Sequence, residues 1–272
     1  MKKKSILFII LGIFLLSTSC EKEIVLHPEN SEEKVVVEAM FTDNPFATSI
    51  TLTKTKGIYE GITGHPKITD AQVKIIDQTT QDEIIFTNAG NGKYSSFTTG
   101  IVGHQYQLVI QAEGQEITGT QTMQAAINLQ RFISTPIENQ PDKYTVKAIF
   151  DDIPNQNDYY LFIMNYADAS ADVEPRFEVA SDLLYNDSEH SLAIPDEVFG
   201  YNQQWIISVF HIDRKNYDYL KVNLRAMNGL VNGAHPFYGI SLGNPQNTVQ
   251  GKQVMGYFLA SPIALSPITI GN

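Results

Sequence analysis

The sequence contains one cysteine, Cys20, among its 272 residues. Without a second cysteine the chain cannot form an internal disulfide bond, so burial of apolar side chains must supply its stability. Hydrophobic residues make up 43% of the sequence, which is enough to build extensive cores. The scarcity of cysteine therefore indicates a chain that is stabilised by packing.

The N-terminal region lacks an apolar run long enough to cross a membrane. Residues Ile6–Leu16 would rise about 16 Å as a helix, against a hydrocarbon core of about 30 Å, which argues against a transmembrane anchor. This run follows three lysines, Lys2 to Lys4, and precedes the small polar residues Ser17–Ser19. That is the layout of a secretory signal, so we predict that residues 1–19 are a signal peptide.

Cys20 stands where such a signal would be cut, which is typical of a lipoprotein. We expect cleavage to leave Cys20 as the first residue, with its thiol acylated. Lipoprotein signals usually carry Leu three residues before the cysteine, whereas this chain has Ser17 there, a looser form that resembles Bacteroidetes signals. The alternative is an ordinary secreted protein, but a lone thiol is a liability in an oxidising compartment.

Positive charge is also scarce, with 19 Lys and Arg against 30 Asp and Glu. Removal of residues 1–19 takes away three lysines and no acidic residue, so the net charge falls from −11 to −14. Nucleic acid binding requires clustered Lys and Arg, so we expect no nucleic acid partner. Anionic headgroups should repel the folded body, which would then stand off the membrane on its tether. Acidity that serves only solubility is the alternative explanation.

Residues 20–34 read as the lipidated cysteine followed by an acidic linker. The fourteen residues after Cys20 could extend to about 46–50 Å. Glu21 and Glu23 resemble signals that send such lipoproteins to the outer cell surface. An ordinary acidic linker would have the same composition, and the protein would then face the periplasm.

Short alternating strands dominate residues 35–124. They are bounded by turn residues, and Glu113-Gly114 predicts a two-residue hairpin loop. The predicted strands are Val35–Phe41, Ser49–Thr55, Ala71–Asp77, Glu83–Thr87, Tyr106–Ala112 and Gln115–Thr122. Strands of this length and spacing favour a mostly β fold, with an N-terminal Ig-like or transthyretin-like β-sandwich.

Residues 125–272 are expected to form a larger β-rich domain with one α-helix. Its predicted strands are Lys143–Phe150, Tyr159–Tyr166, Arg176–Ala180 and Trp205–Ile212. Asp213 can cap a helix near residues 214–228, because apolar residues recur there at helical spacing and Asn228-Gly229 is a typical helix end.

These residues resemble a Bacteroidetes outer-membrane lipoprotein family catalogued as domain of unknown function 4249. The matching segments are Cys20–Glu23, Lys34–Glu38, Asp70–Ile76, Gly92–Tyr94, Gly103–Leu108, Tyr217–Leu220 and Asn247–Phe258. The family usually has a denser glycine stretch near the end, from which Lys252, Gln253 and Met255 depart. The resemblance implies a companion of a TonB-dependent outer-membrane transporter, by analogy with starch-utilisation-type systems.

No motif for catalysis, cofactor binding or metal binding withstands inspection. Gly239-Ile-Ser-Leu-Gly243 fits a nucleophile elbow, but no histidine lies beyond His235, so the hydrolase order of serine, acid and histidine cannot be built. The six histidines are scattered, and His211 lies in a strand-like run, which favours a hydrogen-bonded structural role. Acidic residues from Asp151 to Asp158 lack calcium-loop spacing and predict a polar turn.

Four aromatic residues are the candidate ligand contacts. Tyr185, Phe199, Tyr201 and Trp205 fall in a segment with Pro195 and Gly200 that looks loop-like. Exposed aromatic rings on loops can stack on sugars or anchor a partner protein, whereas packing in the interior is the alternative.

The sequence therefore favours a non-enzymatic lipoprotein of the outer membrane, anchored through Cys20 and exposed at the cell surface. We expect it to capture a ligand for a TonB-dependent transporter or to dock onto that transporter, without a cofactor. The alternatives are a surface hydrolase with dispersed carboxylates and a structural or adhesive surface module.

Overall fold

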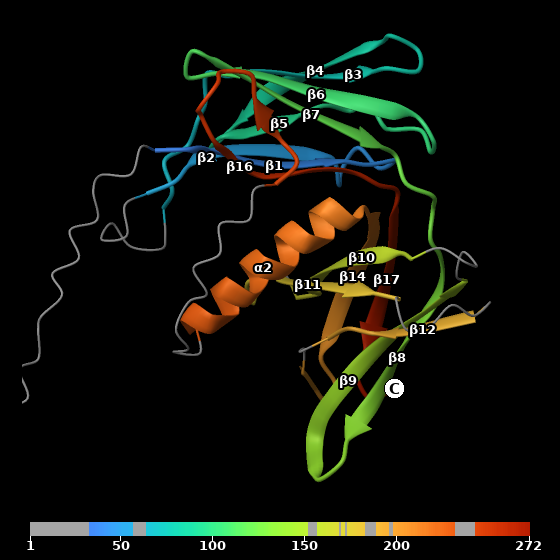
Figure 1. Cartoon of the computed structure of the whole chain (residues 1–272). Coiled ribbons are helices and arrows are strands. Elements are labelled where there is room, and N and C mark those ends of the chain that lie inside the picture. Colours follow the sequence, from blue (N-terminus) through green and yellow to red (C-terminus); the bar gives the residue numbers. More distant parts are fainter. Residues whose placement is uncertain are drawn as a thin grey trace, which may run out of the picture.

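The computed structural model describes residues 33–56, 64–151, 157–168, 170–171, 173–182, 189–195, 198–231 and 243–272. The predicted signal peptide, Cys20, Tyr185 and residues 239–242 of the elbow motif lie outside these ranges. Within them the chain is mostly β, as predicted, with two layered β units on either side of one helix, α2 (Arg214–Val231) (Figure 1). No helix in this part of the chain is both long and apolar enough to span a membrane.

A nine-stranded sheet that folds over on itself forms the first unit. Its strand order is β15-β7-β6-β3-β4-β5-β2-β1-β16. The bounds are β1 (Val35–Phe41), β2 (Ser49–Lys54), β3 (Gln72–Asp77), β4 (Glu83–Gly90), β5 (Lys93–Ser95), β6 (Gln105–Ala112), β7 (Gln115–Thr122), β15 (Gln246–Asn247) and β16 (Val254–Ala260). The first half of β4 pairs with β3 and the second half pairs with β5, so β4 passes between the two layers of a sandwich.

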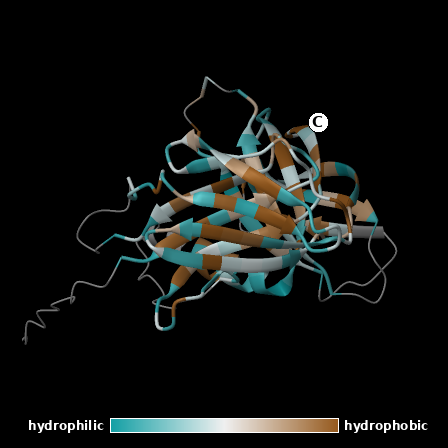
Figure 2. Cartoon of the chain, turned by 90° about the horizontal axis from the view of Figure 1, so that it is seen from above, coloured by the Kyte–Doolittle hydropathy of each residue, from teal (hydrophilic) through white to brown (hydrophobic). Residues whose placement is uncertain are grey.

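Alternating side chains build the core of this sandwich. Val35, Val37, Ala39 and Phe41 of β1 are buried, and their neighbours along the strand are not. Seen from above, the outer strands show the same alternation of hydrophobic and hydrophilic residues (Figure 2). The predicted hairpin loop is confirmed, because Glu113 and Gly114 both have positive φ, 53° and 68°.

Two strands late in the chain, β15 and β16, return to the first unit before β17 (Ile263–Thr269) joins the second. β16 pairs in parallel with β1, from Val35 opposite Val254 to Phe41 opposite Ala260. The prediction assigned residues 125–272 to a separate C-terminal domain, and the structure differs because β15 and β16 complete the N-terminal sheet. Periodicity identifies a strand but does not identify its partner, so the sequence pattern could not reveal this pairing.

The second unit also has two layers. One contains β9 (Gln140–Asp151) with β8 (Asn128–Ile137), β12 (Glu189–Ala193) and β13 (Phe199–Gly200), and the other contains β10 (Tyr159–Tyr166), β11 (Arg176–Ser181), β14 (Gln204–Ile212) and β17 (Ile263–Thr269). Phe150 of β9, Phe162 of β10 and Trp205 of β14 meet in the core between the layers. The sequence pattern did not identify β8, whose residues are mostly exposed, with polar and apolar residues in equal number.

Helix α2 joins the two units. Asp213 caps it, since Asp213 Oδ1 accepts a hydrogen bond of 2.8 Å from the Asn216 backbone N–H, as predicted. Tyr217 and Leu220 pack on Phe210 in the second unit. On the other side, the Tyr219 ring lies 6.3 Å from the Tyr257 ring of β16. The helix therefore lies between β1 and β16 on one side and β10, β11 and β14 on the other (Figure 1).

Candidate functional site

The structure places the predicted aromatic ligand contacts in different environments, some buried and one exposed. Phe199 and Trp205 are 0% and 1% exposed, and their rings meet edge to face at 5.6 Å. The Arg176 guanidinium lies 4.6 Å from the centre of the Trp205 ring. The prediction that these two aromatic residues contact a ligand is therefore wrong, because Trp205 belongs to a strand with both edges paired and points into the core.

Tyr201 is the exposed member of this set, with 58% of its surface accessible. Its ring stacks on Tyr144 with centres 6.1 Å apart. Tyr185 lies outside the described residues. Among the described members of this predicted set, Tyr201 alone therefore presents its ring at the surface.

β16 ends the first sheet on one side, and β7 is next to the short end strand β15 on the other; β7 and β16 lie side by side and define a seam in the sandwich. Gly119 of β7 packs against Phe258 of β16, where a Cβ on the glycine would be 3.5 Å from the ring. Near one end of this contact the Gln124 backbone N–H donates to the Ala260 carbonyl at 3.2 Å. The seam is therefore a boundary between two strand edges.

Side chains close the β16 edge. Asn244 Oδ1 accepts from the Phe258 N–H at 2.7 Å, and Asn244 Nδ2 donates to the Phe258 carbonyl at 2.6 Å. Asn216 Nδ2 donates to the same carbonyl at 3.0 Å. Asn244 thus replaces the backbone of a neighbouring strand at this position.

Among the described residues, no strand pairs with the centre of the outer β7 edge. Two bonds fix which residues face the seam, because the Met123 N–H donates to His104 on the β6 side, whereas the Glu116 carbonyl accepts from Thr248 on the seam side. Backbone groups of successive strand residues point to opposite sides, so the even-numbered residues of β7 face the seam. They are Glu116, Thr118, Thr120 and Thr122.

Only part of this row has partners among the described residues. Thr118 pairs with Gln246 of β15, and the Thr122 carbonyl accepts from Gln124 Nε2 at 3.0 Å. The N–H and carbonyl of Thr120 and the N–H of Thr122 make no hydrogen bond with any other described residue. Three backbone groups are therefore available along this edge.

A groove of about 550 Å³ runs along the open edge. Its lining residues are Gln105, Thr118, Gly119, Thr120, Gln121, Thr122, Gln124, Asp213, Arg214, Lys215, Asn244 and Gln246. Five consecutive residues of β7 contribute to it. Because side chains alternate between the faces of a sheet, consecutive residues can line one groove only along the strand edge. The groove therefore exposes backbone as well as side chains.

The start of α2 forms the facing wall and is held in place by Asp213. Asp213 Oδ1 caps the helix, and Asp213 Oδ2 accepts from Gln121 Nε2 at 3.0 Å. Arg214 forms an ion pair of 3.4 Å with Asp218. Lys215 is exposed and has no ion pair with another described residue. This wall therefore presents an exposed lysine beside the hydrogen-bonded carboxylate of Asp213.

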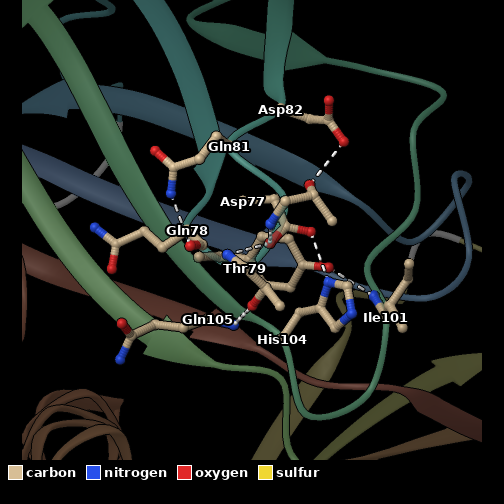
Figure 3. A network of polar contacts seen from close by, with 10 residues as sticks. Asp77, Gln78, Thr79, Gln81, Asp82, Ile101, His104 and Gln105 are labelled. Carbon is tan, nitrogen blue, oxygen red and sulfur yellow. Dashed lines mark hydrogen bonds and ion pairs between the residues drawn. The ribbon is translucent and has the colours of Figure 1, made fainter.

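A polar network near Gln105 stabilises the strand on which β7 is paired (Figure 3). His104 Nδ1 lies 2.8 Å from Asp77 Oδ2, and the Gln105 N–H donates to Thr79 Oγ1 at 3.2 Å. Burial raises the pKa of Asp77, but hydrogen bonds from His104 and from the N–H groups of Thr79 and Thr80 outweigh it and hold the pKa below its ordinary value. The network anchors the start of β6, and through it the position of β7.

A second polar cluster is centred on His211 of β14 in the second unit. His211 Nε2 is 3.0 Å from Asp158 Oδ1, and His211 Nδ1 is 3.2 Å from the Ala125 carbonyl. Asp158 and Asp182 are each 1% exposed. These contacts join the segment after β7 to β14, and they agree with the structural role expected for His211. Across the described ranges, no group of three or more His, Cys, Asp or Glu is arranged to hold a metal ion.

Comparison with known proteins defines the family. Residues 21–264 match the model of the family described as Domain of unknown function (DUF4249), and the chain belongs to that family. Among curated proteins, none matches this chain.

Solved structures give distant matches. A segment of two fibronectin type III domains from chicken tenascin is 9% identical, with 65% of this chain and 88% of that one covered and a TM-score of 0.22. A protein from Bacteroides uniformis ATCC 8492 described as a proposed carbohydrate-binding protein is 8% identical, with 86% and 98% covered and a TM-score of 0.20. Scores this low carry no argument about function.

The groove was not predicted from the sequence. The alternation of threonine at Thr118, Thr120 and Thr122 signals a polar face on β7. It does not show that the backbone of this strand is left partly unpaired, because that depends on where β15 ends.

Proposed function

We propose that this chain is a non-enzymatic lipoprotein of the outer membrane, anchored by acyl chains on Cys20 and exposed at the cell surface. It captures a ligand for a TonB-dependent transporter, or docks onto that transporter. The observation that carries the proposal is the polar groove along β7, which offers hydrogen-bonding groups and whose described carboxylate, Asp213, is hydrogen-bonded at both oxygens.

The state of Asp213 supports binding over catalysis at this groove. Asp213 is the one carboxylate among the lining residues that the structure describes, and each of its oxygens accepts a hydrogen bond. A general base needs a carboxylate oxygen that is available to a substrate proton. The groove therefore suits a molecule that is held rather than transformed.

The membrane position rests on the N-terminal sequence. Lys2 to Lys4, the run Ile6–Leu16 and Cys20 form a lipoprotein signal, and the acidic linker supplies a tether. Several acyl chains at Cys20 would be needed for stable retention, since one chain anchors only marginally. The transporter partner rests on the family resemblance alone.

The substitution Cys20→Ser tests the anchor. We expect the variant to fold normally and to leave the membrane fraction, whereas the unmodified chain stays in it. Treatment of intact cells with an external protease then distinguishes the cell surface, where the chain is cleaved, from the periplasmic face. Retention of Cys20→Ser in the membrane fraction would show that the lipoprotein assignment is wrong.

Purification of the unmodified chain in mild detergent tests the partner. We expect a TonB-dependent transporter to co-purify with it. A chain that is purified without a transporter, and that no transported ligand stabilises, would contradict the proposed role.

A further inference from the structure

We infer that the groove binds an extended peptide, which adds as a β-strand to the open edge of β7 and places an acidic side chain near Lys215. This inference rests on the proposed ligand-capturing function and names the class of ligand. It is carried by the geometry of three backbone groups, the length of the opening and the charge of the facing wall.

The backbone groups of β7 already have the arrangement that a partner strand requires. The Thr120 N–H and carbonyl and the Thr122 N–H face the groove, and none is bonded to another described residue. Residues two apart in a strand are separated by about 6.6–6.8 Å, which is the repeat at which an added strand presents its own donors and acceptors. An extended peptide can satisfy all three groups, as in other cases of strand addition.

The opening has defined ends. β15 occupies the edge as far as Thr118, and the bond from the Gln124 N–H to Ala260 closes the edge beyond Thr122. Between these ends lie two outward-facing residues, which matches a ligand of about three to five residues in an extended conformation. A volume of about 550 Å³ also lies in the usual range for ligand sites.

The exposed Lys215 in the facing wall favours an acidic side chain in the ligand. Lys215 has no ion pair with another described residue, whereas Asp213 is fully engaged in hydrogen bonds. A ligand carboxylate near Lys215 would gain a charge partner in a groove whose other described side chains are neutral amides and hydroxyls, apart from the paired Arg214 and the hydrogen-bonded carboxylate of Asp213.

An oligosaccharide is the competing ligand, and the lining disfavours it. Sugar sites commonly place an aromatic ring under the apolar face of the sugar. None of the described residues that line the groove is aromatic. The periodic row of backbone groups also gives no particular advantage to a sugar, so the observations favour a peptide.

Amide hydrogen exchange of the chain carrying Cys20→Ser tests the inference. The probe is the acetylated and amidated peptide Thr-Asp-Thr-Asp-Thr, and we expect it to slow exchange of the Thr120 and Thr122 amides by at least about tenfold at saturation. The Thr118 amide, which β15 already pairs, should change little. The same peptide with alternate backbone nitrogens methylated should fail to protect, and the lysine version, Thr-Lys-Thr-Lys-Thr, should bind more weakly.

Two substitutions of one residue separate backbone from side chain. Thr120→Pro removes the N–H from the groove, and we expect it to reduce the affinity for the aspartate peptide by about tenfold or more. Thr120→Ser keeps the N–H and should bind as the parent does. Lys215→Glu should weaken binding of the aspartate peptide and strengthen binding of the lysine peptide.

Four results would overturn the inference: no protection of Thr120 and Thr122, equal protection by the methylated peptide, equal loss in both Thr120 variants, or protection by maltopentaose in place of the peptide. Its failure is distinguishable from failure of the proposed function. Loss of peptide binding with a co-purifying transporter would reject only the peptide, whereas peptide binding without membrane attachment or a transporter would reject only the proposed role.

Discussion

The neighbouring edges of β7 and β16 differ in whether their outward-facing backbone groups have hydrogen-bond partners. On β16, the Gly256 backbone hydrogen-bonds the Tyr219 hydroxyl, Phe258 is bound by two asparagine side chains and the Ala260 carbonyl accepts from Gln124. On β7, Thr120 and the Thr122 N–H face the groove without such partners among the described residues. One edge is closed and the other is open.

Solvent access explains the difference. Helix α2 packs against β16, and buried backbone groups must be paired because water cannot reach them. The Thr120 and Thr122 side chains are exposed, so water can satisfy the neighbouring backbone groups at little cost to stability. Open edges also invite other strands, which proteins usually prevent. The closed edge therefore serves folding, and the open edge is available for binding.

The largest expected effect comes from Gly256 of β16, which lies opposite Val37 of β1. Gly256 has φ +115°, and a Cβ there would lie 1.8 Å from the Val37 carbonyl oxygen. We expect Gly256→Ala to reduce the free energy of unfolding by more than about 4 kcal/mol. The positive φ disfavours a side chain, and the Val37 carbonyl belongs to the backbone of β1 and cannot move aside as a flexible side chain could. Denaturant unfolding of the purified chain measures this loss.

Gly251 is the matched control for this substitution. It also has a positive φ, +85°, but no atom lies within 4 Å of the position that an added Cβ would take. Gly251→Ala should therefore cost only about 1–2 kcal/mol, from the left-handed backbone alone. Equal losses of stability at the two glycines would show that the close approach of Val37 adds nothing to the cost of a side chain at Gly256.

Asn244 should have the next largest effect. Asn244→Ala leaves the Phe258 N–H without its partner, although the Phe258 carbonyl keeps Asn216. We expect the free energy of unfolding to fall by about 2–3 kcal/mol, the cost of an unsatisfied buried polar group together with a lost hydrogen bond. Gln246→Ala, at an exposed position in the same segment, should change it by less than about 0.5 kcal/mol. A small effect at Asn244 would mean that its hydrogen bonds to Phe258 contribute little to the stability of the fold.

How far the sequence predicts this molecule depends on the range of each interaction. Strand alternation, the Glu113-Gly114 turn and the Asp213 cap are local, and the structure confirms them. The return of β16 to β1 joins residues more than two hundred positions apart, and no periodicity encodes it. For the same reason the seam, the groove and the role of Asn244 could not be predicted.

Trp205 shows a different kind of error. Its alternation with Ile207 and Val209 predicts an inward-facing strand residue, and all three are buried. The nearby Pro195 and Gly200 favoured a loop, although β14 begins at Gln204. Strand periodicity around Trp205 was the better guide than the composition of the segment before it.

A pair of proline substitutions compares closed and open positions on one strand. Thr118 and Thr120 both point their backbone toward the seam, but Thr118 pairs with β15 and Thr120 does not. Proline removes the N–H and constrains φ at both sites, so the difference between the variants isolates the hydrogen bond. We expect Thr118→Pro to lower the free energy of unfolding by about 1 kcal/mol more than Thr120→Pro. Equal losses would indicate that Thr120 is also paired.

The smallest expected effect concerns Glu38, beside the closed edge. Glu38 of β1 lies opposite Tyr257 of β16, and it is exposed by surface area. Desolvation by the surrounding protein nevertheless raises its pKa above 4.5, an effect that the positive charges of Lys67 and His65 partly offset. Burial, together with the charge of Glu38, raises the pKa of Tyr219 to about 12.

A raised pKa means that the folded state binds a proton more tightly than the unfolded state does. Glu38 therefore contributes stability below about pH 4.5 that is lost as the pH rises through the folded-state pKa. Glu38→Gln, which cannot ionise, should stabilise the chain by a few tenths of a kcal/mol near neutral pH, since solvent screening limits the effect at an exposed group. This gain should vanish in acid, as measured by denaturant midpoints at about pH 4 and about pH 8. Glu138→Gln, in the exposed turn between β8 and β9, should show no such dependence. A loss of stability in Glu38→Gln at neutral pH would mean that the ionised carboxylate supports the closed edge, in contrast to the neutral side chains that bind Phe258.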